Sequence, residues 1–189
     1  MNNNNTKAEL VGITLGDGNI GRYKRCQYLR IYCNPKHIQY IKEVEKILTN
    51  FFKKKPYIYF RKDAGVTYLE ISKKNIDSIL QIPVGDKIKN KVSVPKWIWK
   101  KNSHIKSCIR GLFDTDGCLY ITGGKYKIVN FCSHNPLLLR DFKRGLERLG
   151  YNPFIRRSNV ELGRMAEVEQ FFKEIKPRNL QHYRFNKPR

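Results

Sequence analysis

The apolar positions of the chain follow the same order twice. The segment Leu10 to Gly18 reads LVGITLGDG, and the segment Ile109 to Gly117 reads IRGLFDTDG. Apolar residues, a glycine and a closing Asp-Gly fall in step in both segments. A repeat of this kind predicts two copies of one structural unit in the chain.

Each copy continues with the same succession of patterns. Alternating stretches at 22–33 and 120–133 predict a strand pair after each Asp-Gly. Both stretches end in Asn-Pro, and a helical spacing of apolar residues follows each. Two further strands and a closing helix are expected in each copy, at 57–62, 66–72 and 75–82, and at 153–157, 159–165 and 167–175.

The order of these patterns predicts an α+β fold of tandem αββαββα repeats related by a pseudo-twofold axis. Residues 83–102 carry Pro83, Gly85, Pro95 and many lysines, so they are expected to form a structured linker anchored by Trp97 and Ile98. We place the boundary near residue 100. The predicted units are therefore 1–100, with the linker, and 101–189.

The two motif segments are expected to be helices, at 6–15 and 103–113. Gly12 and Gly16 lie four residues apart on one helix face, as Gly111 and Thr115 do on the other. A glycine inside a helix costs about 1 kcal/mol relative to alanine. A close crossing of the two helices would offset that cost, which predicts that the repeats pack through them.

Such a crossing would bring Asp17 and Asp116 together at the C-terminal ends of the two helices. Helix C-termini carry a partial negative charge, and Mg²⁺ prefers carboxylate, carbonyl and water oxygens. The peptide oxygens of Gly16 and Thr115 are then further candidate ligands. A single Asp-Gly is usually only a turn, but its duplication in matching context argues against that interpretation. Asp114 is expected to face solvent or to have a structural role rather than a catalytic one, because its counterpart in the first copy is a leucine.

Charge and composition identify the class of partner. Lys and Arg total 38 against 16 Asp and Glu, a net charge of +22, which indicates a polyanionic partner. No apolar run approaches the length of a membrane span and no signal peptide is evident, so nucleic acid is favoured over a membrane. The five cysteines form no CxxC pair and the four histidines are scattered, which argues against zinc. A cytoplasm or an organelle matrix is expected.

The first strand stretch predicts a surface for DNA. Leu29 and Ile31 are expected to face the helices, and 21–34 contains no acidic residue. The opposite face is then predicted to hold Arg22, Lys24, Cys26, Tyr28, Arg30 and Tyr32. The second copy offers Lys125, Tyr126, Lys127 and Asn130, but the sequence does not show which of them share a face of the strand. Arg61, Lys62, Arg156 and Arg157 are candidates for guanine edges or phosphates.

The two motif segments resemble those of the LAGLIDADG homing endonucleases, and the repeat covers nearly the whole chain. Two motifs imply the monomeric subclass. The resemblance implies that the motif helices form the interface between halves, that each half presents a saddle-shaped antiparallel sheet to the major groove, and that the eighth motif residue binds metal. Those residues are Asp17 and Asp116. Thr14 and Leu15 depart from the usual motif without removing a metal ligand.

The resemblance predicts an endonuclease that makes a Mg²⁺-dependent double-strand break in a long DNA site, with Mn²⁺ able to substitute. It also implies staggered cuts and a target in an intron-free or intein-free allele. Lys73 and Arg164 precede the closing helices and are candidates for a cation near the phosphate. The alternatives are a non-cleaving maturase that binds intron RNA or a DNA-binding regulator, and a basic ribosomal-type protein whose Asp-Gly pairs are turns. Retention of both acids favours the nuclease.

Overall fold

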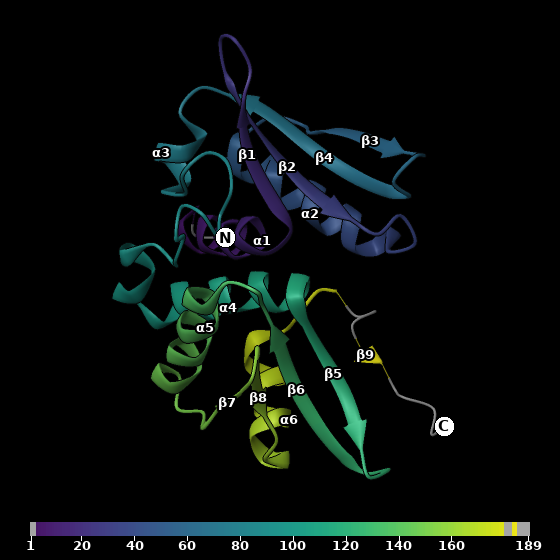
Figure 1. The fold of residues 1–189 in the computed structure, drawn as a ribbon, viewed down its shortest axis with the longest axis vertical. Helices are drawn as coiled ribbons and strands as arrows, with labels where there is room; N and C mark the ends of the chain where they lie inside the picture. The colour runs from purple at the N-terminus through teal and green to yellow at the C-terminus, as the bar shows by residue number, and fades with distance from the viewer. Residues whose placement is uncertain (1–2, 180–182, 185–189) are drawn as a thin grey trace.

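The computed structural model describes residues 3–179 and 183–184. Figure 1 shows two halves stacked along the long axis, with helices α1 (Asn3–Asp17) and α4 (Asn102–Asp116) between them. The two motif helices therefore form the seam, and the fold is the α+β double repeat that the sequence predicts. In the described residues, no helix is long and apolar enough to cross a membrane.

Each half follows the predicted order of elements. In the N-terminal half, α1 is followed by β1 (Gly18–Arg22), β2 (Gln27–Cys33), α2 (Ile38–Phe52), β3 (Tyr57–Arg61), β4 (Val66–Lys73) and α3 (Ile76–Leu80). In the C-terminal half, α4 is followed by β5 (Gly117–Thr122), β6 (Tyr126–Cys132), α5 (Pro136–Arg148), β7 (Phe154–Arg156), β8 (Asn159–Leu162), α6 (Met165–Ile175) and β9 (Tyr183–Arg184). The motif helices are longer than predicted and run directly into β1 and β5.

The two sheets share one topology. Their strand orders are β1-β2-β4-β3 and β7-β8-β6-β5-β9. Gly18 aligns with Ile31 in the first sheet, and Gly117 aligns with Phe131 in the second. These matched registers make Ile31 and Phe131 equivalent positions. One strand departs from the prediction, because β9 lies parallel to β5 at the edge of the second sheet.

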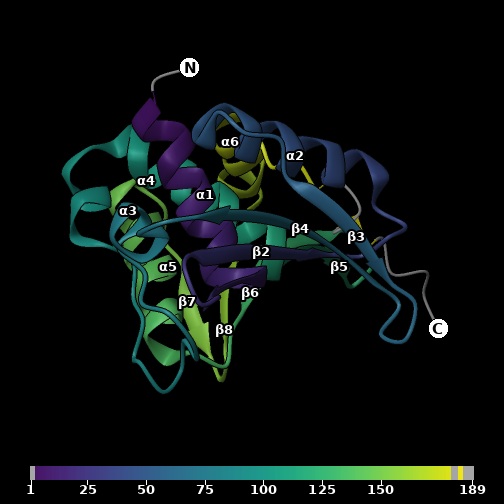
Figure 2. The ribbon, with the colours of Figure 1, turned by 90° about the horizontal axis from the view of Figure 1, so that it is seen from above.

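Helices cover one side of each sheet. In Figure 2, α2 and α6 lie on the same side of the strands. The helix α2 buries Tyr40, Val44, Ile47 and Leu48 in the core, at the spacing expected of one helix face. The helix α5 begins with Pro136, and the Asn135 side chain caps it by accepting from the backbone N–H of Leu137 at 3.0 Å.

The linker between α3 and α4 is ordered, and its C-terminal part packs on the second half. Its short 3-10 helix η1 (Lys96–Lys100) buries Ile98, and Trp97 lies edge-on to His104. The backbone N–H of Val94 donates to Asp141, and the Asn135 side chain donates to the carbonyl of Val92. Residues 92–98 thus contact the C-terminal half, although the prediction grouped them with residues 1–100.

Candidate active site at the crossing of the motif helices

The motif helices cross in backbone contact. A Cβ atom added to Gly12 would lie 2.2 Å from the carbonyl oxygen of Cys108. A Cβ atom added to Gly111 would lie 2.3 Å from the carbonyl oxygen of Glu9. Both distances are far below van der Waals contact, so a side chain at either position requires the helices to separate. The structure confirms the close crossing that the glycine spacing predicts.

Alanine at Gly12 or Gly111 is expected to destabilise the protein by about 2 kcal/mol or more, because overpacking outweighs the roughly 1 kcal/mol gain in helix propensity. Chemical denaturation of each variant measures the loss. Gly163→Ala serves as the control, since its Cβ would meet only a side-chain atom at 4.0 Å. Unchanged stability of Gly12→Ala would contradict the close crossing.

The crossing brings Asp17 and Asp116 together at the ends of α1 and α4. A Cβ atom on Gly16 would lie 3.0 Å from Oδ2 of Asp116, so this carboxylate lies against the other helix. Burial raises the pKa of Asp17, and the charge of Lys87 opposes that shift. Burial, followed by the charge of Asp17, raises the pKa of Asp116 to about 6, and Lys87 again opposes. Two carboxylates that repel each other in a partly buried site favour a cation between them.

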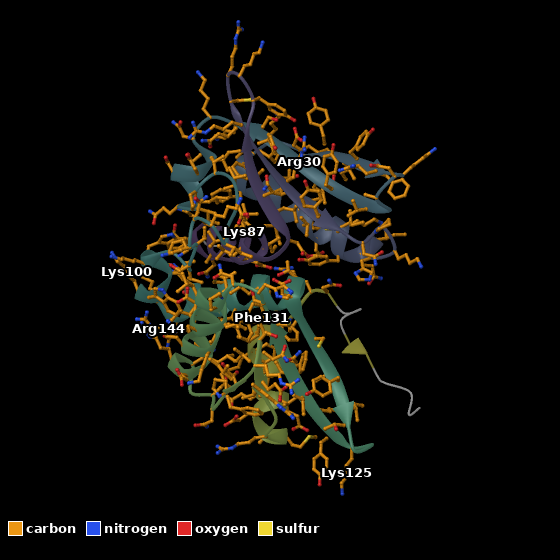
Figure 3. The ribbon with its side chains drawn as sticks, viewed as in Figure 1. Arg30, Lys87, Lys100, Lys125, Phe131 and Arg144 are labelled. Atoms are coloured by element: carbon orange, nitrogen blue, oxygen red, sulfur yellow. The ribbon has the colours of Figure 1, made fainter. Side chains whose placement is uncertain are left out.

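Lys87 supplies a positive charge that was not predicted from the sequence. Its ammonium donates to the carbonyl oxygens of Thr14 at 3.3 Å and Leu15 at 2.8 Å, and also to that of Gly16. Burial lowers the pKa of Lys87, while the charges of Asp116 and Asp17 act in the opposite direction. Figure 3 labels Lys87 beside α1. The C-terminal carbonyls of α1 therefore already bind one cation.

A compact turn in the linker holds Lys87 in place. The backbone N–H of Gly85, where φ is +94°, donates to the carbonyl of Ile20 in β1 at 2.9 Å. The Asp86 carboxylate accepts from the backbone N–H groups of Ile88 and Lys89. The carbonyl of Lys87 accepts from Val92. The lysine thus projects from an ordered segment tied to the first sheet.

A cleft of about 360 Å³ opens beside this group of charges. Its walls come from both halves and from the linker, and they comprise Leu15, Gly16, Lys87, Ile88, Asp116, Cys132, Ser133, His134, Asn135 and Leu138. Within the described residues no group of three or more His, Cys, Asp or Glu side chains could hold a metal. A metal at the crossing would therefore depend on Asp17, Asp116 and peptide oxygens such as those of Gly16 and Thr115. Carboxylate and carbonyl oxygens are the donors that Mg²⁺ takes.

The two other cations proposed from the sequence lie away from the carboxylates. Ile31 in β2 aligns with both Gly18 at the start of β1 and Leu69 in β4. Lys73 lies four residues beyond Leu69, so it is displaced from the level of Gly18 by about 13 Å along the strand. Its ammonium lies 5.9 Å from the centre of the Phe52 ring, on the helix side of the sheet.

Arg164 occupies the matching place in the second half. It follows Val160 by four residues, and Val160 is aligned through Phe131 with the strand start at Gly117. Its exposed guanidinium pairs with Glu167 at 3.4 Å. These placements do not support catalytic cations at Lys73 and Arg164, because position in the chain before the closing helix says nothing about distance along the strand.

Asp114 is a structural residue. Its Oδ1 accepts from the backbone N–H groups of Arg178 at 2.8 Å and Asn179 at 3.0 Å. Burial raises the pKa of this carboxyl to about 7. Arg178 in turn pairs with Glu9 and Glu43 of the first half. This network holds the segment after α6 against the seam between the halves, and it confirms the structural assignment of Asp114.

On one side of the first sheet lies no helix of the described residues, and we call this side the N-terminal open face. It is defined by Tyr28, Arg30, Tyr32, Tyr59, Arg61, Tyr68 and Glu70. Leu29 and Ile31 are buried on the opposite side, as predicted. Lys24 and Lys62 are exposed in the turns at the two ends of this sheet. Arg22 was predicted on the open face, but it aligns with Gln27 and so falls on the helix side. The turn at 23–26 interrupts the alternation on which that prediction relied.

The second sheet has a matching C-terminal open face, which we define by Cys118, Tyr120, Tyr126, Ile128, Asn130, Arg156 and Glu161. Burial of Val129 and Phe131 settles the register that the sequence left open. Tyr126 and Asn130 lie on the open face, and Lys125 and Arg157 lie in turns. Lys127 has the same parity as Val129 and therefore lies on the helix side, which does not support the DNA contact expected of it.

Each open face also carries one acidic residue that the sequence prediction missed. Glu70 aligns with Arg30, and Glu161 aligns with Asn130. Because Arg30 and Asn130 precede the equivalent residues Ile31 and Phe131, the two glutamates occupy equivalent places. The absence of acids from 21–34 gave no information on the neighbouring strand, which supplies Glu70.

Comparison with known proteins agrees with this architecture. Residues 103–176 match the LAGLIDADG-like domain. The structure of I-DmoI in complex with DNA and calcium matches with a TM-score of 0.65 at 18% identity, over 93% of this chain and 91% of that chain. No curated protein matches this chain in sequence.

Two further structures have the same fold. The I-LtrWI LAGLIDADG homing endonuclease bound to target DNA matches with a TM-score of 0.60 at 13% identity, over 93% of this chain and 85% of that chain. The N-terminal LAGLIDADG domain of DUF199/WhiA matches with a TM-score of 0.62 at 12% identity, over 93% and 84%. Identities this low establish likeness of fold alone. The chain therefore contains a LAGLIDADG-like domain at 103–176 and has the two-repeat LAGLIDADG fold over nearly its whole length.

Proposed function

We propose that this protein is a monomeric, site-specific homing endonuclease that makes a metal-dependent double-strand break in DNA. The observation that carries the proposal is the pair of partly buried carboxylates, Asp17 and Asp116, held together with Lys87 between two uncovered sheets. A protein that only binds a polyanion gains nothing from two acids at the centre of its binding surface. Metal-assisted hydrolysis of a phosphodiester uses such acids, because they can hold divalent cations.

The residues at the crossing divide the work of hydrolysis between them. Asp17 and Asp116, with the peptide oxygens of Gly16 and Thr115, would hold Mg²⁺, or Mn²⁺ in its place. A divalent ion bound there supplies Lewis acidity and lowers the pKa of a bound water. Lys87 places an ammonium beside both carboxylates, where it offsets negative charge that develops on the phosphate. The buried surroundings strengthen each of these interactions.

Structures of similar proteins support the choice of ligands. I-DmoI structures contain DNA together with calcium or manganese, or were obtained in the presence of magnesium. The same divalent cations suit the oxygen donors at the crossing of α1 and α4. We infer that double-stranded DNA lies across the N-terminal and C-terminal open faces, with its scissile phosphates at the cleft beside Asp116.

DNA affinity is expected to fall about 10³-fold or more between 50 and 200 mM salt, because lysines and arginines that neutralise phosphates release counterions. A titration of a duplex at several salt concentrations, in Ca²⁺, measures the slope. Lys24→Gln is expected to reduce the slope by about 1, since Lys24 is exposed in the turn of the first hairpin. An affinity that does not change with salt would count against the open faces as the DNA site.

A cleavage assay tests the proposal directly. The protein is incubated with a randomised library of duplexes in Mg²⁺, and in parallel with Ca²⁺ or EDTA. Sequence-specific double-strand cutting in Mg²⁺ alone is the expected result. Binding without cutting in any metal would favour a maturase or DNA-binding regulator with the same fold, and structured intron RNA would then be the next ligand to test.

A further inference from the structure

Arg30 is held from several sides on the N-terminal open face. Its Nε donates to Oε2 of Glu70 at 2.7 Å, and its Nη2 donates to the hydroxyl of Tyr23 at 3.0 Å. The guanidinium carbon lies 4.3 Å from the ring centre of Tyr28 and 4.9 Å from that of Tyr68. Two hydrogen bonds and two aromatic faces therefore fix the plane of this guanidinium. Figure 3 labels Arg30 on the first sheet.

The acid that holds Arg30 is itself fixed. Glu70 accepts hydrogen bonds from the Tyr23 hydroxyl at 3.1 and 3.3 Å and from the Ser72 hydroxyl at 3.2 Å. The side chains of Arg30 and Glu70 are 26% and 13% exposed. Exposed ion pairs usually sample many geometries and contribute little. This half-buried pair has one geometry, so little conformational entropy remains for Arg30 to lose when it binds a ligand.

The arrangement leaves one edge of the guanidinium available. An arginine side chain has five N–H donors in a planar fork. The Nε side is occupied by Glu70 and Tyr23, whereas within the described residues Nη1 donates to no acceptor. The remaining Nη1–Nη2 edge presents two parallel donors. Paired donors of this kind match O6 and N7 of guanine in the major groove.

The equivalent place in the second half has different chemistry. Asn130 stands in the position of Arg30, and its Nδ2 lies 3.7 Å from the sulfur of Cys118. Glu161 stands in the position of Glu70 and accepts from the Tyr120 hydroxyl at 3.4 Å. In the part of the chain that the structure describes, Glu161 has no ion pair. The C-terminal open face therefore has no fixed guanidinium at this position.

We propose that Arg30 reads a guanine in the N-terminal half of the DNA target, that Glu70 and Tyr23 position it, and that the C-terminal half requires no guanine at the pseudo-symmetric place. This inference rests on the proposed DNA binding and adds a target asymmetry to it. Lysine in place of Arg30 keeps the charge but cannot form the paired contact. Glutamine in place of Glu70 keeps the size of the side chain but weakens its hold on Arg30.

Binding selection from randomised duplexes in Ca²⁺ tests the inference without cleavage. Wild-type protein is expected to enrich guanine at one position in one half-site. Arg30→Lys is expected to lower that preference about tenfold to a hundredfold, the discrimination of one bidentate base contact. Glu70→Gln and Tyr23→Phe are expected to lower it in the same direction, although Arg30 remains. Arg148→Lys, at an exposed position near the end of α5 and outside both open faces, is the matched control and is expected to keep the preference.

The outcomes separate this inference from the proposed function. A wild-type protein that selects no DNA sequence overturns both. If the wild-type protein selects a sequence, and Arg30→Lys and Glu70→Gln still enrich the same guanine, the inference alone is overturned. A uniform loss of affinity across all sequences, with a smaller salt dependence, would show that Arg30 binds a phosphate, and this also overturns the inference. Glu70→Gln leaves Arg30 in place, so this variant still tests the inference if Arg30→Lys fails to fold.

Discussion

Replacing Asp116 with asparagine is expected to abolish double-strand cleavage, with a loss of at least about 10³-fold in the single-turnover rate, while DNA binding persists. An asparagine side chain keeps the shape of Asp116 but cannot supply the negative charge that a divalent ion requires. Asp17→Asn is expected to have the same effect, because the two acids share one partly buried site. Chelation by EDTA should reproduce the loss in the wild-type protein.

Folding stability distinguishes a lost metal ligand from a damaged structure. The raised pKa of Asp116 means that the fold disfavours its ionised form, so a neutral asparagine should leave stability unchanged or higher in metal-free buffer. A thermal melt of each variant measures this. Glu169→Gln, an exposed position on α6, is the control and should cut normally. Full cleavage by Asp116→Asn would refute the proposed catalytic role.

The repeat made the centre of the molecule predictable from sequence. Two segments with the same order of apolar residues, glycines and Asp-Gly indicate two helices that cross closely, and the contacts of Gly12 and Gly111 confirm that crossing. The acid pair follows, because equivalent residues at the ends of crossing helices must meet. These conclusions depend on local spacing, which a sequence contains.

Properties that depend on distant segments were not predictable in the same way. Lys87 lies in a lysine-rich linker, and no periodic pattern distinguishes it from the exposed Lys89. Glu70 faces Arg30 only through the register between β2 and β4. Arg22 was placed on the wrong side because a turn interrupts the alternation of its strand, and the side of Lys127 was left open because apolar residues at 128, 129 and 131 obscure the alternation there. The parallel strand β9 depends on how the chain returns after α6.

The two halves of the candidate site are equivalent in their acids but not in their surroundings. Asp17 and Asp116 end matching helices, yet Lys87 comes from the linker that follows the first half, and among the described residues its ammonium donates to carbonyls of α1 alone. The network of Asp114 and Arg178 is likewise built around α4 and the segment after α6. A duplicated fold has thus acquired different supports on its two sides, and the substitution of single residues can separate their contributions.

Lys87→Met is expected to lower the single-turnover cleavage rate about 10²-fold or more, because it removes a partly buried positive charge beside the carboxylates without a large change in side-chain volume. A loss of about 1 kcal/mol in stability should accompany it, since the ammonium also satisfies carbonyls at the C-terminal end of α1. Lys89→Met, an exposed position in the same turn, is the matched control and should cut at the wild-type rate.

A titration with Mn²⁺ decides how Lys87 acts. If its ammonium neutralises charge on the phosphate, Lys87→Met should remain slow at saturating metal. If the ammonium instead competes with metal for the carbonyl of Gly16, Lys87→Met should bind Mn²⁺ more tightly and cut at least as fast as the wild type at low metal. The second result would exclude Lys87 from catalysis, because charge neutralisation at the phosphate cannot be lost without slowing the reaction.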